Sequence, residues 1–294
     1  MKPCYVCETT FEGRSKLCLR CRTLRDSRHD GALKPDDMRA AFDKAGNCFR
    51  CRYSGVCLDE KNRKSPYFRS VDHWVPGEKK VVLCGWLFNF MKSSLTGPEF
   101  VTVVPHLDDV LQGLVPFNKE IIKFTHWNWT AAASVPKYRP DPALKLVNVQ
   151  YCDICGFPPL RYSLYCARCN RLVQRHGRVG SQRNAFKASY NKELDAFLCY
   201  YTKIPLELTG RFGPWHLSLD HRTPGDESSQ VVAALWVNRM KTYLTELQFR
   251  AVIRSLANHI RTGAPFDRSV LSAQSFARTV RRLGGGNPMV VRRL

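Results

Sequence analysis

The chain contains the same pattern of candidate metal ligands twice. Four cysteines, arranged as Cys-x-x-Cys, ten residues and Cys-x-x-Cys, occur near the N-terminus and again 148 residues later. They are Cys4, Cys7, Cys18 and Cys21, and then Cys152, Cys155, Cys166 and Cys169. A repeat of this length predicts two similar domains, because the units of solenoid proteins are usually about 20 to 50 residues long.

A second polar group is duplicated downstream of the cysteines. It consists of an Asp-His pair and an Asn that is followed three residues later by Lys. The first copy is Asp72, His73, Asn89 and Lys92, and the second is Asp220, His221, Asn238 and Lys241. One inserted residue between Gly225 and Val231 accounts for the change in displacement from 148 to 149 residues. These residue types are typical of a metal-dependent active site rather than of a packed core.

Each four-cysteine group has the spacing of a structural zinc site. Zinc prefers four soft ligands in a tetrahedron, and each Cys-x-x-Cys turn delivers two thiolates to one side of the ion. Four thiolates leave no coordination position open for water, so a catalytic role for these ions is not expected. The sequence therefore predicts two structural Zn²⁺ ions, and the alternative is two groups of buried, reduced cysteines.

A further cysteine set occurs in the first half of the chain. It contains Cys48, Cys51, Cys57 and Cys84, and only Cys51 has a counterpart in the second half, Cys199. A third zinc site is one interpretation of this set. Buried thiols are the favoured one, because cysteine often behaves as a small apolar residue.

The composition favours a polyanionic partner. The sequence has 46 Lys and Arg against 25 Asp and Glu, a formal net charge of +21. Basic side chains that neutralise phosphates release counterions, so nucleic acid, most simply DNA, is the expected partner, with a ribosomal or merely soluble basic protein as the alternative. There is no apolar run of about 18 residues and no apolar N-terminal stretch, so neither a membrane span nor a signal peptide is expected. Paired cysteines without secretion signals predict an intracellular, reducing compartment, whose organelle the sequence does not identify.

The landmarks divide the chain into four predicted regions. They are a first zinc-binding repeat at 1–125, a linker with three prolines at 126–148, a second repeat at 149–264 and a basic tail at 265–294. Within each repeat we expect a strand that ends in the Asp-His pair (67–73 and 215–221), a short second strand (81–83 and 231–232) and a helix (85–95 and 233–253). A longer helix is expected at 181–200. The predicted fold class is α+β.

This order of elements resembles the ββα-metal motif of the HNH (His-Me finger) nuclease superfamily. The 16 residues from His73 to Asn89 are similar to the spacing in its endonuclease VII-like branch, and the cysteine groups look like zinc-ribbon or treble-clef sites. The resemblance implies that the Asp and Asn of each copy bind Mg²⁺ or Mn²⁺ and that His73 and His221 are general bases. Lys92 and Lys241 fall one helical turn after the Asn, where they contact the phosphate or are solvated.

The resulting hypothesis is a metal-dependent endonuclease with two HNH-like sites, acting on double-stranded or branched DNA as a pseudo-twofold monomer. An imidazole accepts the proton of the attacking water, and a hard dication stabilises the charge on phosphorus. The main alternative is a non-catalytic zinc-dependent protein that binds DNA or RNA on a degenerate HNH scaffold. A zinc-ribbon scaffold for a protein complex explains the cysteines but not the Asp-His pairs.

Overall fold

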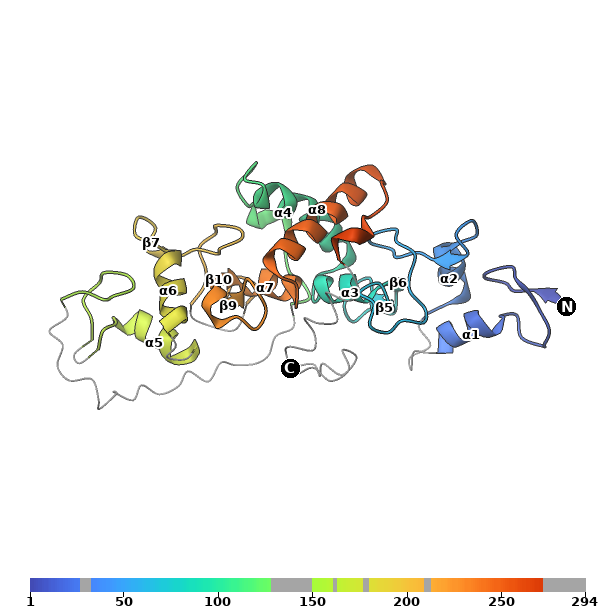
Figure 1. The fold of residues 1–294 in the computed structure, drawn as a ribbon, viewed down its shortest axis with the longest axis horizontal. Helices are drawn as coiled ribbons and strands as arrows, with labels where there is room; N and C mark the ends of the chain where they lie inside the picture. Colours follow the sequence, from blue (N-terminus) through green and yellow to red (C-terminus); the bar gives the residue numbers. More distant parts are fainter. Residues whose placement is uncertain (27–32, 128–149, 161–162, 177–179, 209–212, 272–294) are drawn as a thin grey trace. The chain divides into compact units, whose positions relative to one another are not determined.

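The computed structural model describes residues 1–26, 33–127, 150–160, 163–176, 180–208 and 213–271, and it confirms the α+β class. Helices and antiparallel two-stranded sheets are interspersed along the chain (Figure 1). The chain forms two compact units: the first unit contains 1–109, 118–126 and the residues from 242 onward, and the second contains 110–117 and 127–241. The boundaries of the predicted domains come from the sequence repeat. The boundaries of the compact units come from the residues that pack together, so the two divisions differ. Most of the predicted linker and most of the basic tail lie outside the described residues.

The first unit begins with the hairpin β1 (Lys2–Pro3) and β2 (Thr10–Phe11), and α1 (Leu19–Asp26), α2 (Pro35–Ala41), β3 (Phe42–Asp43) and β4 (Cys48–Phe49) follow. The hairpin of β5 (Arg69–His73) and β6 (Val81–Gly85) then leads into α3 (Trp86–Lys92) and α4 (Gly97–Leu111), whose last two residues belong to the second unit. The 3-10 turn η1 (Lys119–Ile121), α8 (Glu246–Thr262) and the 3-10 turn η3 (Arg268–Val270) complete it.

The described part of the second unit follows the order that runs from α1 to α3 in the first, with a 3-10 turn added between the strands of its longer hairpin. Its elements are α5 (Ala167–His176), α6 (Gly180–Ser189), β7 (Tyr190–Asn191), β8 (Ala196–Phe197), β9 (Leu217–His221), η2 (Glu227–Ser229), β10 (Gln230–Ala234) and α7 (Leu235–Lys241). The predicted helix at 181–200 is wrong beyond Ser189, because Tyr190 begins β7 and the chain turns back into β8.

In each repeat the Asp-His pair ends the first strand of a hairpin, and a helix follows the second strand. Asp72 pairs with Val82 across β5 and β6, and Asp220 pairs with Val231 across β9 and β10. The helix follows the second strand directly and buries its apolar residues, such as Leu87 in α3. Strand, strand and helix are therefore present in both copies, as the alternation of the sequence indicated.

The prediction of a single helix at 233–253 is wrong, because two separate helices, α7 and α8, occupy this part of the chain. The chain leaves the helical conformation at Thr242, whose φ is 50°, and the equivalent Ser93 has φ 51°. Thr245 then caps the next helix, because its hydroxyl accepts a hydrogen bond from the Gln248 amide while the Gln248 side chain binds the Thr245 amide. Such a capping box starts a new helix, so α7 and α8 are separate.

The C-terminal segment of each half of the chain packs in the unit that the other half forms. Phe266, from the second half, packs in the first unit against Tyr67, with ring centres 6.0 Å apart. The equivalent Phe117, from the first half, packs in the second unit against Trp215 at 5.9 Å. In the first unit α8 also lies beside α4 (Figure 1), where Arg261 binds the carboxylates at the end of α4. Each hairpin-helix motif is therefore completed by residues of the other repeat.

Candidate functional site

The first cysteine group is gathered at one point. Cys4 and Cys7 lie in the β1–β2 turn, and Cys18 and Cys21 lie at the start of α1. All four are buried, and their sulfur atoms lie within 4.8 Å of one another. The Cys18 amide donates to the Cys4 sulfur at 3.3 Å. Burial raises the pKa of the Cys4 thiol, but backbone N–H donors outweigh it and bring the pKa to about 6.

The second group has the same geometry. Cys152, Cys155, Cys166 and Cys169 are buried with their sulfur atoms within 4.8 Å of one another, and Cys155 and Cys166 approach to 3.5 Å, as Cys7 and Cys18 do. A tetrahedral zinc with bonds of about 2.3 Å places its sulfur ligands roughly 3.8 Å apart. Both groups fit a zinc ion by this measure. The structure thus supports two zinc-binding sites, one in each unit.

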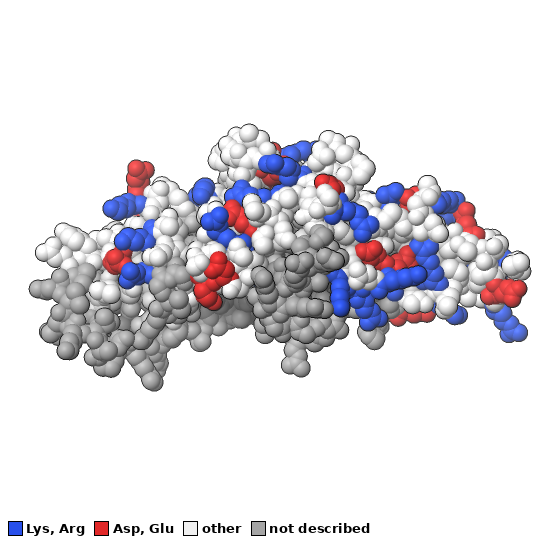
Figure 2. All heavy atoms as spheres, viewed as in Figure 1, with Lys and Arg blue, Asp and Glu red and all other residues white. Residues whose placement is uncertain are grey.

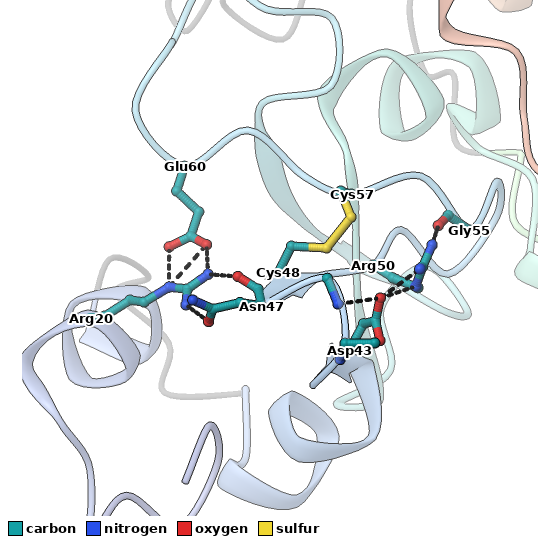
Figure 3. Close-up of a disulfide and its surroundings, with 10 residues drawn as sticks. Arg20, Asp43, Asn47, Cys48, Arg50, Gly55, Cys57 and Glu60 are labelled. Carbon is teal, nitrogen blue, oxygen red and sulfur yellow. Dashed lines mark hydrogen bonds and ion pairs between the residues drawn. A yellow bond between two sulfur atoms is a disulfide. The ribbon is translucent and has the colours of Figure 1, made fainter. Parts of the chain in front are cut away.

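The additional cysteines of the first half do not form a third four-cysteine group. Cys48 and Cys57 are joined in a disulfide, which corrects both interpretations made from the sequence for this pair (Figure 3). Cys51 and Cys84 are buried and are not joined in a disulfide, as expected for buried thiols. Beside the disulfide, Arg50 binds the Asp43 carboxylate and the Gly55 carbonyl, and Arg20 binds Glu60 and Asn47 (Figure 3).

Asp72 of the first motif is buried among partners. The Tyr53 hydroxyl donates a hydrogen bond to its Oδ2, and the Lys92 ammonium lies 3.4 Å from the same oxygen. Among the described residues no hydrogen bond reaches Oδ1 of Asp72. Burial raises the pKa of the Asp72 carboxyl, and Lys92 and Tyr53 oppose that rise. Both partners therefore bind the same carboxylate oxygen.

Asn89 is held against the strand that carries Asp72. Its Nδ2 donates to the Ser70 hydroxyl at 2.9 Å and to the Val71 carbonyl at 3.2 Å. Both bonds use the nitrogen, so the amide oxygen is free of hydrogen bonds within the described part of the chain. The structure thus brings Asn89 to the strand residues that directly precede Asp72.

His73 is exposed at the end of β5. Its Nδ1 lies 2.7 Å from the Glu78 carbonyl. A carbonyl accepts only, so Nδ1 carries the proton and Nε2 is the basic nitrogen. None of the described residues bonds to Nε2. This is the arrangement that a general base requires, because one nitrogen is fixed and the other faces outward.

The second motif has the same skeleton with more contacts to its carboxylate. The Tyr201 hydroxyl donates to Oδ2 of Asp220 at 2.6 Å, and the Lys241 ammonium donates to Oδ1 at 3.1 Å. Burial raises the pKa of the Asp220 carboxyl, and Lys241 and Tyr201 oppose it. Asn238 donates to the Ser218 hydroxyl and the Leu219 carbonyl, as Asn89 does in the first motif. Both carboxylate oxygens are engaged here.

His221 also differs from its counterpart. Its Nε2 lies 3.0 Å from the Gln230 side-chain nitrogen and 3.7 Å from a Glu227 carboxylate oxygen. Gln230 occupies the position of Val81, and Glu227 belongs to the turn that carries the inserted residue. The nitrogen that is open in His73 is therefore occupied in His221.

The two lysines are not solvated, which corrects that alternative. The side chains of Lys92 and Lys241 are each only 1 % exposed, and each ammonium is paired with an aspartate. Lys92 also donates to the Leu95 carbonyl at 2.5 Å, and Lys241 donates to the His221 carbonyl at 2.7 Å. A buried ammonium needs such partners, because an unpaired charge in the interior is costly. Contact of these lysines with phosphate stays a prediction.

The tyrosines on the two aspartates were missed as site residues. The sequence comparison matches Tyr53 with Tyr201, and their neighbours Cys51 and Cys199, but these residues precede the Asp-His pairs by 19 positions. Tyrosine is also common in cores. Only the fold shows that both hydroxyls reach the carboxylates.

Basic side chains occur in several places on the visible face of the molecule, with acidic side chains among them (Figure 2). No helix within the described residues has the length and apolar character needed to cross a bilayer. Comparison of the chain with protein-family models, with curated proteins and with solved structures finds no match.

Proposed function

We propose that this chain is a metal-dependent endonuclease that hydrolyses phosphodiester bonds in nucleic acid, with DNA preferred. The observation that carries the proposal is the first motif, where the exposed His73 has Nδ1 fixed on the Glu78 carbonyl and follows the buried Asp72 directly. A net charge of +21 favours a polyanionic substrate.

The residues of this motif divide the chemistry between them. His73 accepts the proton of the attacking water at Nε2, and the Glu78 carbonyl holds the ring in the required tautomer. Asp72 and Asn89 would hold Mg²⁺ or Mn²⁺ through their available oxygens, and such an ion supplies charge stabilisation at the phosphate. Tyr53 and Lys92 fix the orientation of the Asp72 carboxylate.

The test is nicking of supercoiled plasmid and of branched DNA with Mg²⁺ or Mn²⁺. We expect nicking that stops with EDTA and returns when the divalent metal is restored, with zinc content measured throughout because EDTA also strips zinc. His73→Ala is the matched inactive variant, and His106→Ala, at a histidine outside both motifs, is the control. No cleavage of DNA or RNA with any of these metals, by protein with two zinc ions per chain, would show that the proposal is wrong.

A non-catalytic nucleic-acid-binding protein is the second candidate. The observation that favours it is the second motif, where both Asp220 oxygens and the His221 Nε2 are engaged by protein groups. In the first motif Lys92 already neutralises Asp72. This candidate predicts salt-dependent binding of DNA or RNA without cleavage, so the same preparation distinguishes the two functions.

A further inference from the structure

Two positions near the histidines hold an arginine and an aromatic residue in both repeats, but in the opposite order. Arg52 and Trp74 of the first repeat are equivalent to Tyr200 and Arg222 of the second. The Arg52 guanidinium carbon lies 5.4 Å from the centre of the Trp74 ring, and that of Arg222 lies 5.7 Å from the Tyr200 ring. The cation–π pair is thus present in both repeats, although neither position keeps its residue type.

A second cation accompanies each ring, and it also comes from unrelated positions. The Lys80 ammonium lies 5.9 Å from the Trp74 ring centre, and the Lys203 ammonium lies 5.1 Å from that of Tyr200. Lys203 is equivalent to Gly55, not to Lys80. The two repeats therefore share an aromatic ring with two cations, assembled from different parts of the sequence.

In the first unit this group is joined to the Asp-His site. Trp74 follows His73 directly and stacks on Tyr53, with ring centres 6.1 Å apart and planes 8° apart. The Tyr53 hydroxyl in turn donates to Asp72. The aromatic ring and its two cations therefore lie beside the candidate catalytic residues.

The second unit has the equivalent connection. Arg222 follows His221 directly, and Tyr200 packs edge-on against Tyr201, the hydrogen-bond donor to Asp220. A groove of about 660 Å³ lies beside this group, and Tyr200, Lys203 and the His221 partner Gln230 contribute to its lining. Its volume is within the range of roughly 300 to 1,000 Å³ that is usual for ligand sites.

The cations of these groups are exposed, unlike the site lysines. Within the described part of the chain no carboxylate forms an ion pair with Arg52, Lys80 or Lys203, whereas the nearby Arg50 is paired with Asp43. A guanidinium that lies over a ring still presents N–H donors at its edge, and these match the oxygens of a phosphate.

We propose that each group is a phosphate clamp, in which Arg52 with Lys80, and Arg222 with Lys203, bind the phosphodiester backbone next to the adjacent histidine. The aromatic ring holds the arginine in position. The inference rests on the proposed function for its substrate class, but the clamp acts on binding and is independent of the chemical step.

The first test measures binding of a fluorescent DNA oligonucleotide without added divalent metal. Arg52→Ala and Arg222→Ala are each expected to weaken binding about fivefold or more and to lower the slope of log affinity against log salt by roughly one. Arg63→Ala and Lys192→Ala remove one exposed charge elsewhere in each unit and are the matched controls. If the clamp variants bind no more weakly than these controls, the proposal is wrong.

The second test uses the exchange that the repeats display. Arg52→Tyr alone should weaken binding, whereas Arg52→Tyr combined with Trp74→Arg recreates the arrangement of Tyr200 and Arg222 and should restore it. Zinc content and the unfolding temperature should match the parent in both variants. A properly folded double variant that binds as weakly as the single one contradicts a role for the pair.

Cleavage assays separate the two proposals. A protein that never cleaves, but shows this pattern of binding, refutes the nuclease and leaves the clamp in place. A protein that cleaves with unchanged KM in Arg52→Ala and Arg222→Ala refutes the clamp and leaves the nuclease. Clamp variants that raise KM more than they change kcat agree with both.

Discussion

The two hairpin-helix motifs have the same frame but different contacts at their reactive atoms. In both, a tyrosine hydroxyl and a buried lysine hold the aspartate, and the helix asparagine binds the first strand. In the first motif Asp72 keeps one oxygen without a hydrogen bond and His73 keeps Nε2 open, whereas the second motif engages the equivalent atoms. The shared contacts stabilise the frame, and from the differing ones we expect the first site to accept a ligand more readily than the second.

This difference separates two roles that the sequence repeat does not distinguish. Identical Asp-His and Asn-x-x-Lys residues predict equal sites, but Gln230 and Glu227, which approach His221, lie outside those residues. We therefore expect the first site to dominate any chemistry, with the second contributing mainly to binding.

Loss of zinc is expected to have the largest effect and to affect one unit at a time. Cys18→Ser should unfold the N-terminal part of the first unit, and Cys166→Ser the equivalent part of the second, because a structural zinc site contributes on the order of 10 kcal/mol. Hydrogen exchange with metal analysis measures this. Loss of protection in both units from either substitution would show that the clusters do not act separately.

Removal of the buried ammonium should be next in size and should distinguish the motifs. Lys92→Met and Lys241→Met each leave a buried aspartate without its cation, at a cost of about 3–5 kcal/mol. The loss should be larger for Lys241→Met, because Lys241 approaches Asp220 to 3.1 Å while Lys92 stays 3.4 Å from Asp72. Urea denaturation measures the free energy of unfolding that each substitution removes. Equal losses would show that the two lysines stabilise their aspartates to the same extent.

Substitution of the histidines should show the asymmetry in activity. His73→Ala is expected to reduce cleavage by about 10²-fold or more, as loss of a general base does. His221→Ala should reduce it much less, because its Nε2 is already engaged. Single-turnover rates on one labelled DNA substrate provide the comparison. Similar losses from both substitutions would mean that the observed contacts do not limit the second site.

The smallest effect is expected from opening the second site. Gln230→Val introduces the residue type found at Val81 and removes the Gln230 contact to His221. In a His73→Ala background, residual cleavage should rise by up to about tenfold, limited by the engaged oxygens of Asp220. Val81→Gln, measured in the parent, is the reciprocal variant and should lower activity.

The frame was predictable because periodicity and ligand spacing depend on local sequence. The alternation before Asp72 and Asp220 gives the strands, and the cysteine spacing gives the clusters. The helix break at Thr242 was missed, because it depends on a positive φ in a residue that does not usually adopt one. The Cys48–Cys57 disulfide was missed because the sequence predicted a reducing compartment, so these cysteines were interpreted as buried thiols or as ligands of a third zinc.

Contacts between distant residues could not be predicted from the pattern. The Tyr53 bond to Asp72 and the Gln230 contact to His221 involve residues outside the duplicated polar set. The exchange of Arg and aromatic residues at positions 52 and 74 is invisible to a search for identical residues, because the two positions differ between the repeats. These contacts depend on the fold, which brings together residues that are far apart in the sequence.

The exchanged C-terminal segments also determine when each unit can fold during synthesis. The Tyr67 hydroxyl binds the Leu271 carbonyl, 204 residues further along the chain, so the first unit is completed only by residues that are made after the whole of the second unit. All residues of the second unit precede Thr242. At about 5–20 residues per second, the ribosome finishes the second unit roughly 1 to 5 seconds before α8 and Phe266 are complete. The N-terminal unit of this protein is therefore expected to mature after the unit that follows it.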